Sequence, residues 1–511
     1  MRLPGRIPTM RYILSAILVF SLATAALAQS RPSSRSATSQ PSEEDHLSVT
    51  THTITLHGQP LKYETTAGTI GIKDDAGKLR CNFFFIAYRV LKDPAYEPGK
   101  RPITFVFNGG PGSSSVWLHL GTVGPMRVNN SDDGTPDAPP HRLVENQETW
   151  LDASDLVFID PVGTGYSRAA DGVAPKDFYG VEQDISSVAD FIRLYLTRYQ
   201  RWSSPKFLAG ESYGTTRAAG LSLYLADRFG IDLNGIVLIS TVLNFQVLSP
   251  EEGNDLPYAL FLPSYTAIAS YHHKLTGDAD QLRAASVAWA TGDYMTALTK
   301  GKSLTPAEQS AVADKLVQFT SLPKEFILKS RLRISPEAFR KHLLNNEEKI
   351  LGRYDARLLA DDPTPATDEL SQDPSDSLYS PSFASDFNDY IRGTLKYETD
   401  IPYHVLARVG PWDFGQGDGY LDVSGRLRQA MLQNPHLKVL VAAGFYDLAT
   451  PFATVNYTIG HMDLGNQISS RLTQTYYGSG HMIYQSSSTR EKLRADVGTF
   501  MTGALPATTQ P

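Results

Sequence analysis

Residues 206–214 constrain the fold of this chain more than any other stretch. They read as a short apolar strand that runs into Gly210-Glu211-Ser212-Tyr213-Gly214 and then into a helix-compatible segment. This arrangement is typical of a nucleophile elbow, in which a strained strand-to-helix turn exposes the serine hydroxyl at the top of a sheet. Gly210 and Gly214 lack a Cβ atom, so two chain segments can approach closely there. Because the motif alone also fits an ordinary glycine-rich turn, the rest of the chain must decide between the two interpretations.

Short apolar runs alternate with helical patterns along the chain. The runs cover residues 102–107, 156–159, 206–209, 235–239 and 437–443, and residues 181–199 read as an amphipathic helix. This order predicts an α/β fold with a mostly parallel central sheet covered by helices on both faces. Residues 48–61 and 79–91 alternate in the strand manner and predict antiparallel strands at the edge of that sheet. Ligands bind beyond the carboxyl ends of such strands, so we expect the functional site in the loops that follow them.

A long insertion interrupts the strand pattern. We assign residues 46–248 and 410–502 to the α/β domain and residues 249–409 to a mainly helical cap. Thr305-Pro306 and Ser335-Pro336 are helix-start signals, because a Ser or Thr cap precedes Pro at the first helical position. Residues 361–382 are rich in Asp, Pro, Ser and Thr and are expected to form a loop. We expect this insertion to cover the strand ends and to exclude water from the site. The alternative is an insertion that lies far from the site and has no part in it.

The first 45 residues predict export. A basic start, an apolar run and Ala26-Leu27-Ala28 match a cleaved signal peptide at residues 1–28, which implies a periplasmic or secreted protein without a stable membrane anchor. The alternative is an uncleaved anchor, but the apolar run is short for a membrane span. Residues 29–45 and 503–511 are expected to be a disordered leader and tail.

Charge and cysteine content exclude several classes of protein. The formal net charge is −7, with no basic run, so the sequence predicts no nucleic-acid partner. Cys81 is the single cysteine, which excludes an intramolecular disulfide and a multi-thiolate metal site. We find no sign of a metal or organic cofactor.

A serine nucleophile needs a base and an acid that orients the base, and in this fold both follow the serine. Asp447 comes just after the apolar run at 437–443, and His481 comes just after a last strand predicted at 470–477. His461 and Asp463 compete for these roles, but they precede the last strand and should lie on a helical connection. The sequence therefore favours Ser212, Asp447 and His481 as a catalytic triad.

An oxyanion formed at Ser212 would need two N–H donors. One is expected from the backbone of Tyr213, directly after the nucleophile. The other is expected from the loop Asn108-Gly109-Gly110-Pro111-Gly112, where glycines let the backbone approach a substrate.

These motifs, together with Gly124-Pro125 and residues 160–167 (Asp-Pro-Val-Gly-Thr-Gly-Tyr-Ser), resemble the serine carboxypeptidases. The resemblance implies an α/β-hydrolase fold, release of C-terminal residues from peptides, and an optimum at acidic pH. It implies that Gly110 and Tyr213 donate to the oxyanion. It also implies that Asn108, Gly109 and Glu211 hold the C-terminal carboxylate of the peptide. Relatives in this family can be homodimers.

A carboxyl group that faces a peptide carboxylate should share a proton with it, because two close carboxylates repel. Glu211 would then favour acidic pH, although it could instead be a helix-start acid stabilised by the helix dipole. Two departures from the family pattern affect this region: Ser113 replaces a cysteine, and Thr122 replaces a glutamate that pairs with the acid before the nucleophile. An esterase or acyltransferase on the same triad, and a non-catalytic binding module, are the alternative functions.

Overall fold

The computed structural model describes residues 45–92, 99–370, 372–415 and 419–506. The described residues all belong to one compact unit, Glu43–Pro511. The predicted signal peptide, nearly all of the predicted leader, and the end of the predicted tail lie outside the described residues.

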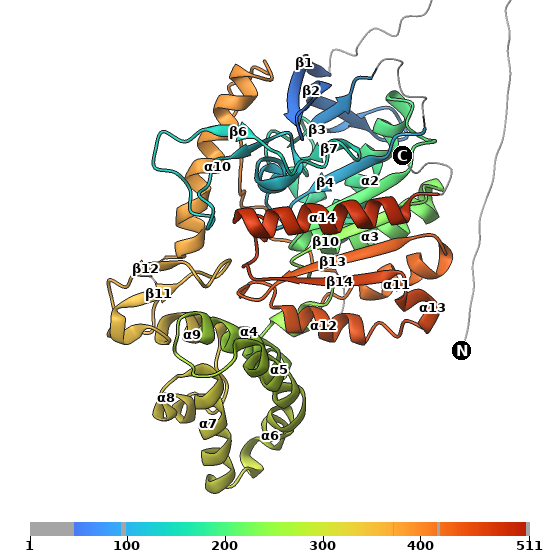
Figure 1. Cartoon of the computed structure of the whole chain (residues 1–511). Coiled ribbons are helices and arrows are strands. Elements are labelled where there is room, and N and C mark those ends of the chain that lie inside the picture. The colour runs from blue at the N-terminus through green and yellow to red at the C-terminus, as the bar shows by residue number, and fades with distance from the viewer. Residues whose placement is uncertain (1–44, 93–98, 371, 416–418, 507–511) are drawn as a thin grey trace, which may run out of the picture. The chain divides into compact units, whose positions relative to one another are not determined.

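Ten strands of the described chain form one sheet (Figure 1). Along it, β1-β2-β3-β7 are antiparallel neighbours and β7-β4-β9-β10-β13-β14 are parallel neighbours, while β8 pairs with β3. The strands are β1 (His46–Leu56), β2 (Gln59–Lys73), β3 (Leu79–Val90), β4 (Ile103–Phe107), β7 (Asp155–Ile159), β8 (Arg168–Ala169), β9 (Lys206–Glu211), β10 (Gly235–Ile239), β13 (Lys438–Gly444) and β14 (Leu472–Tyr477).

The burial of these strands explains their order. Every residue of β4, β7, β9 and β10 is buried, as expected for central parallel strands covered on both faces. The outer strand β1 alternates between exposed and more buried side chains, and a turn at His57-Gly58 joins it to β2. The expected mostly parallel sheet with antiparallel strands at one edge is therefore confirmed.

Helices cover both faces of the sheet. One core contains side chains of α2, α3 and α11, and the other contains side chains of α1, α10 and α14. These helices are α1 (Val116–Leu118), α2 (Val181–Arg198), α3 (Tyr213–Phe229), α10 (Pro374–Gly393), α11 (Ser424–Gln433) and α14 (Ser487–Ala504). Two further helices, α12 (Phe452–Gly460) and α13 (Asn466–Ser469), connect β13 to β14. A separate two-stranded sheet consists of β5 (Met126–Val128) and β6 (Leu143–Glu145).

The insertion builds a separate helical core. Its elements are α4 (Leu256–Tyr271), α5 (Ala279–Trp289), α6 (Met295–Lys300), α7 (Pro306–Thr320), α8 (Lys324–Lys329), α9 (Pro336–His342), β11 (Lys349–Leu351) and β12 (Leu359–Asp361). Thr305 caps α7 in a full capping box and Ser335 caps α9, so both predicted helix starts are confirmed.

The loop expected at residues 361–382 is wrong in its second half, where α10 begins. Asp373 accepts a hydrogen bond from the Ser375 N–H as the N-cap, and Pro374 occupies the first helical position. This is the same start signal that marks α7, and the surrounding Pro and Ser residues concealed it. The helix packs on the α/β domain, where the ring of Phe383 lies 4.8 Å from that of Trp117. No helix among the described residues is both long enough and apolar enough to span a membrane.

Candidate active site

Ser212 stands on the turn between β9 and α3, where the sequence places it. Its φ of 58° is unusual for a residue with a side chain, and such strain is typical of functional turns. The Ser212 N–H donates to the Ile239 carbonyl of β10 at 3.0 Å, which anchors the turn to the neighbouring strand. A Cβ atom on Gly109 would lie 2.4 Å from the Tyr213 nitrogen, so only glycine lets this loop approach the turn.

His481 and Asp447 form a hydrogen-bonded pair beyond the carboxyl ends of β13 and β14. His481 Nδ1 donates to Asp447 Oδ2 at 2.8 Å, and both side chains are buried. The other Asp447 oxygen accepts N–H groups of Ala449 and Thr450 at 2.7 and 3.0 Å. The Thr450 hydroxyl donates to Asp447 Oδ2 at 2.7 Å. These contacts fix the imidazole so that its Nε2 atom is free to act as a base.

The main chain of His481 is held from two regions of the molecule. Its N–H donates to the Tyr354 carbonyl, in the insertion, at 2.6 Å. Its carbonyl accepts the Ser240 hydroxyl, after β10, at 2.5 Å. The insertion therefore contributes directly to the position of this histidine.

The electrostatics of the pair favour the charged form of each group. Burial lowers the pKa of His481, but the charge of Asp447 and its hydrogen bond outweigh burial, and the net pKa is raised. Burial raises the pKa of Asp447, but His481 and the Thr450 contacts outweigh it, and the net pKa is lowered. Asp447 therefore stays ionised and stabilises a protonated His481.

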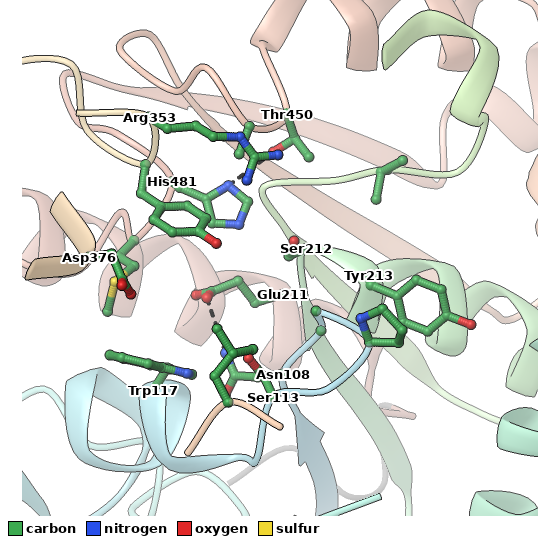
Figure 2. Close-up of a pocket in the computed structure, with 18 of the residues that line it drawn as sticks. Asn108, Ser113, Trp117, Glu211, Ser212, Tyr213, Arg353, Asp376, Thr450 and His481 are labelled. Carbon is green, nitrogen blue, oxygen red and sulfur yellow. Dashed lines mark hydrogen bonds between the residues drawn. The ribbon is translucent and has the colours of Figure 1, made fainter. Parts of the chain in front are cut away.

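Ser212 and His481 line one cavity of about 180 Å³ (Figure 2). Among the described residues, the Ser212 hydroxyl has no hydrogen-bond partner, and such catalytic contacts commonly tighten only when substrate binds. The cavity is lined by residues of the strand-end loops and of the insertion: Asn108, Gly109, Gly110, Pro111, Ser113, Trp117, Glu211, Ser212, Tyr213, Val242, Phe245, Leu248, Arg353, Tyr354, Ser375, Asp376, Tyr379, Leu406, Phe414, Ala449, Thr450, His481 and Met482.

Asn108 and Glu211 meet at the floor of this cavity. Asn108 Nδ2 donates to Glu211 Oε1 at 3.0 Å, and Asn108 Oδ1 accepts the Leu118 N–H at 3.0 Å. Burial raises the pKa of Glu211 to about 7, against a partial offset from His481. Glu211 is therefore mostly protonated in acidic solution. We name Asn108, Gly109 and Glu211 the carboxyl clamp.

Thr122, which stands where the family pattern has a second acid, is fully buried, and its hydroxyl has no hydrogen-bond partner among the described residues. Tyr484 packs against the residue before Thr122, because a Cβ atom on Gly121 would lie 2.3 Å from the Tyr484 ring. The Tyr484 hydroxyl lies close enough to Glu211 to affect its pKa, although full hydrogen-bond geometry is not met. Glu211 thus neighbours a phenol, whose own pKa is raised by burial, so that it stays neutral.

A buried ion pair supports this site and was missed by the sequence interpretation. Arg217 Nε donates to Asp184 Oδ2 at 2.7 Å, and Arg217 Nη1 donates to the Asn108 carbonyl at 2.6 Å. Both side chains are at most 2% exposed. The pair joins α2 and α3 to the loop that follows β4. The available signal was an arginine within the apolar start of the helix after the elbow.

Asp160, which opens the glycine-rich motif at residues 160–167, also supports the strand-end loops. It accepts both the N–H and the hydroxyl of Ser115 at 2.8 Å. Burial raises its pKa to about 6, against offsets from these Ser115 contacts. The motif therefore positions the loop after β4 and does not line the cavity itself.

The competing residues lie elsewhere. His461 is the C-cap of α12, is exposed, and stacks on Tyr457 with ring centres 3.9 Å apart. Asp463 is also exposed and follows the same helix. The prediction that both lie on the connection between the last two strands is confirmed.

Comparisons with known proteins agree with this geometry. The family model for serine carboxypeptidase matches residues 57–272. The chain is 29% identical to the pheromone-processing carboxypeptidase KEX1 of Cryptococcus gattii, over 34% of this chain and 24% of that protein. It is 27% identical to serine carboxypeptidase-like 34 of Arabidopsis thaliana, over 37% of each chain.

A solved structure is similar over more of the chain. The prohormone-processing carboxypeptidase KEX1(delta)p of Saccharomyces cerevisiae matches with a TM-score of 0.54 and 18% identity, over 86% of this chain and 91% of that one. At this identity the likeness shows the fold alone, which is the α/β-hydrolase fold. In sequence, the chain spans about a quarter to two fifths of the length of the curated relatives it matches. The chain is therefore similar to serine carboxypeptidases over residues 57–272, which is less than half of its length.

Proposed function

We propose that this protein is a serine-type carboxypeptidase that releases C-terminal amino acids from peptides. The observation that carries the proposal is a carboxyl clamp beside a buried His481–Asp447 pair, both lining the cavity that contains Ser212. A serine hydrolase needs the pair and the nucleophile, but only an exopeptidase needs a site for a free carboxylate next to them.

In this mechanism the Ser212 hydroxyl attacks the last peptide carbonyl and its proton passes to His481 Nε2. Asp447 stabilises the resulting imidazolium, since it is ionised and bonded to Nδ1. The backbone N–H groups of Tyr213 and Gly110 donate to the oxyanion. His481 then protonates the leaving amine, the terminal amino acid departs, and a water molecule hydrolyses the acyl-enzyme with the same base.

The carboxyl clamp determines which bond reacts. The Asn108 amide, the Gly109 N–H and a protonated Glu211 would together hold the terminal carboxylate of the peptide. Because the pKa of Glu211 is raised to about 7, the clamp keeps its proton at acidic pH and loses it above neutrality. We therefore expect the best binding of free-acid substrates on the acidic side of neutrality.

The decisive experiment compares an N-blocked dipeptide with its C-terminal amide, using the purified protein from about pH 4 to about pH 8. Release of the terminal amino acid from the free acid and not from the amide supports the proposal. Equal cleavage of both, or hydrolysis of simple esters alone, would assign the same triad to an esterase or acyltransferase. Asn108→Ala should then affect esters and peptides equally, whereas a carboxypeptidase should lose mainly peptide hydrolysis.

We also propose that the protein is exported after removal of residues 1–28. The basic and apolar start of the chain and its Ala-Leu-Ala motif support this. N-terminal sequencing of the protein from separated cell fractions should find Gln29 first, outside the cytoplasm; an intact Met1 would contradict it. Relatives in the resembled family can be homodimers, and light scattering tests this for the present chain, because a dimer gives twice the mass of one chain.

A further inference from the structure

The cavity around Ser212 has two halves, and the carboxyl clamp lies in one of them. Figure 2 shows Glu211 and Asn108 to one side of Ser212, with Trp117 and Asp376 beyond them, and Tyr213 on the other side. Our inference rests on the proposed function. If the terminal carboxylate reaches the clamp, the side chain of the last residue must lie in the same half, because both branch from one carbon atom.

The insertion-side wall of the clamp half comes from the start of α10. Asp376 lies in the first turn of this helix and Tyr379 lies three residues later, so both face the cavity from one side of the helix. Trp117 lies on the same side of the cavity, and its contact with Phe383 of the same helix holds it in place (Figure 2). The last residue of a substrate would therefore lie beside both a tryptophan ring and a carboxylate.

The charge of Asp376 has no cationic partner within the described part of the chain. Its carboxylate accepts only the Ser380 hydroxyl, at 2.9 Å. The other acidic or basic residues that line the cavity are Glu211, His481 and Arg353. Glu211 is mostly protonated in acid. Figure 2 places Arg353 beside Thr450 and His481, away from Asp376. The clamp half therefore presents one uncompensated negative charge.

We propose that Asp376 selects peptides whose last residue is Lys or Arg. The aliphatic stem of such a residue can lie along Trp117 while its cationic end reaches Asp376. A terminal Glu or Asp would be repelled by the same carboxylate. The ordinary alternative is that Asp376 only stabilises the start of α10 through the helix dipole, which would not distinguish one substrate from another.

The test uses N-blocked dipeptides that share one penultimate residue and end in Lys, Arg, norleucine, Leu or Glu. We expect the wild-type kcat/KM for terminal Lys to exceed that for norleucine by at least about tenfold. Asp376→Asn should bring the kcat/KM for terminal Lys close to that for norleucine. Asp376→Glu should keep the preference for terminal Lys, and Asp376→Lys should shift the preference toward terminal Glu. Asp389→Asn is the matched control, because it removes the same charge from an exposed position of α10.

The outcomes separate this inference from the proposed function. Equal hydrolysis of terminal Lys and norleucine by the wild type, or an unchanged preference in folded Asp376→Asn, overturns the selector role and leaves the carboxypeptidase intact. Failure to release any terminal residue, while a fluorophosphonate still labels Ser212, overturns the proposed function and the inference with it. Thermal unfolding of each variant shows whether it is folded.

Discussion

The strand-end loops and the insertion line the same cavity, but they hold their polar groups in different ways. Asp447, at the end of β13, is fully buried and accepts hydrogen bonds from three groups besides His481. Asp376, in the insertion, is half-buried and has a single hydroxyl partner among the residues that the structure describes, and Arg353 is exposed. Groups that must perform chemistry need fixed positions and compensated charge. Groups that recognise a side chain need unpaired charge within reach of the substrate.

The largest effect is expected from Ser212→Ala, which removes the hydroxyl group at the strand end. We expect kcat on a free-acid dipeptide to fall by at least about 10⁴-fold, because Ser212 is the proposed nucleophile that forms the acyl-enzyme. The measurement is release of the terminal amino acid by a protein with an unchanged unfolding midpoint. Substantial remaining hydrolysis would mean that another residue attacks the substrate.

Arg217→Met tests the buried support of the strand-end loops. Loss of the guanidinium leaves Asp184 as a buried, unpaired charge, so we expect about 3–5 kcal/mol less free energy of unfolding in urea. Replacing Asp184 with Leu in the same protein should recover much of that loss, since the unpaired charge is gone. A loss below about 1 kcal/mol would show that the pair does not stabilise this region.

The pH dependence of KM tests whether Glu211 binds as a neutral group. A pKa raised to about 7 leaves Glu211 protonated at pH 6 and ionised at pH 8. The KM of a free-acid dipeptide should therefore rise by up to about tenfold for each pH unit above neutrality. Glu211→Gln cannot ionise and should give a flat profile over the same range. A wild-type KM that does not change with pH would remove Glu211 from carboxylate binding.

Glu211→Gln should also change how the stability of the folded protein depends on pH. The folded-state pKa of Glu211 is raised above its ordinary value of 4.5, so the wild type loses stability as pH rises from that value through about 7. Glu211→Gln should then unfold at a higher temperature than the wild type at pH 8 and at a similar temperature at pH 4.

The smallest effect is expected within the insertion. Arg333 forms a two-pronged ion pair with Asp255, but the two side chains remain 31% and 21% exposed. Arg333→Met should lower the free energy of unfolding by at most about 1 kcal/mol and leave kcat unchanged. A loss as large as that of Arg217→Met would mean that the two regions are not built differently.

The sequence predicted the catalytic frame better than the walls of the cavity. Buried parallel strands leave continuous apolar runs, and the residues after them can be read directly, which indicated Ser212, Asp447 and His481 as the candidate triad. Asp184 and Arg217 could not be found in this way, because charged residues are ordinarily exposed and only their pairing permits burial. The Pro and Ser content around the start of α10 predicted a loop there, so the sequence did not indicate Asp376 as a residue of the site. Contacts such as Trp117 with Phe383 join distant segments, which periodicity does not reveal.

The hydrogen bond from the His481 N–H to the Tyr354 carbonyl has a consequence for engineering. A Cβ atom on Gly480 would lie only 2.3 Å from that same carbonyl, so the two segments fit closely. The insertion is therefore not a module that can be exchanged at will. A segment grafted from another protein of this fold must bring a carbonyl to the same place, or the exchange would displace His481, the proposed base.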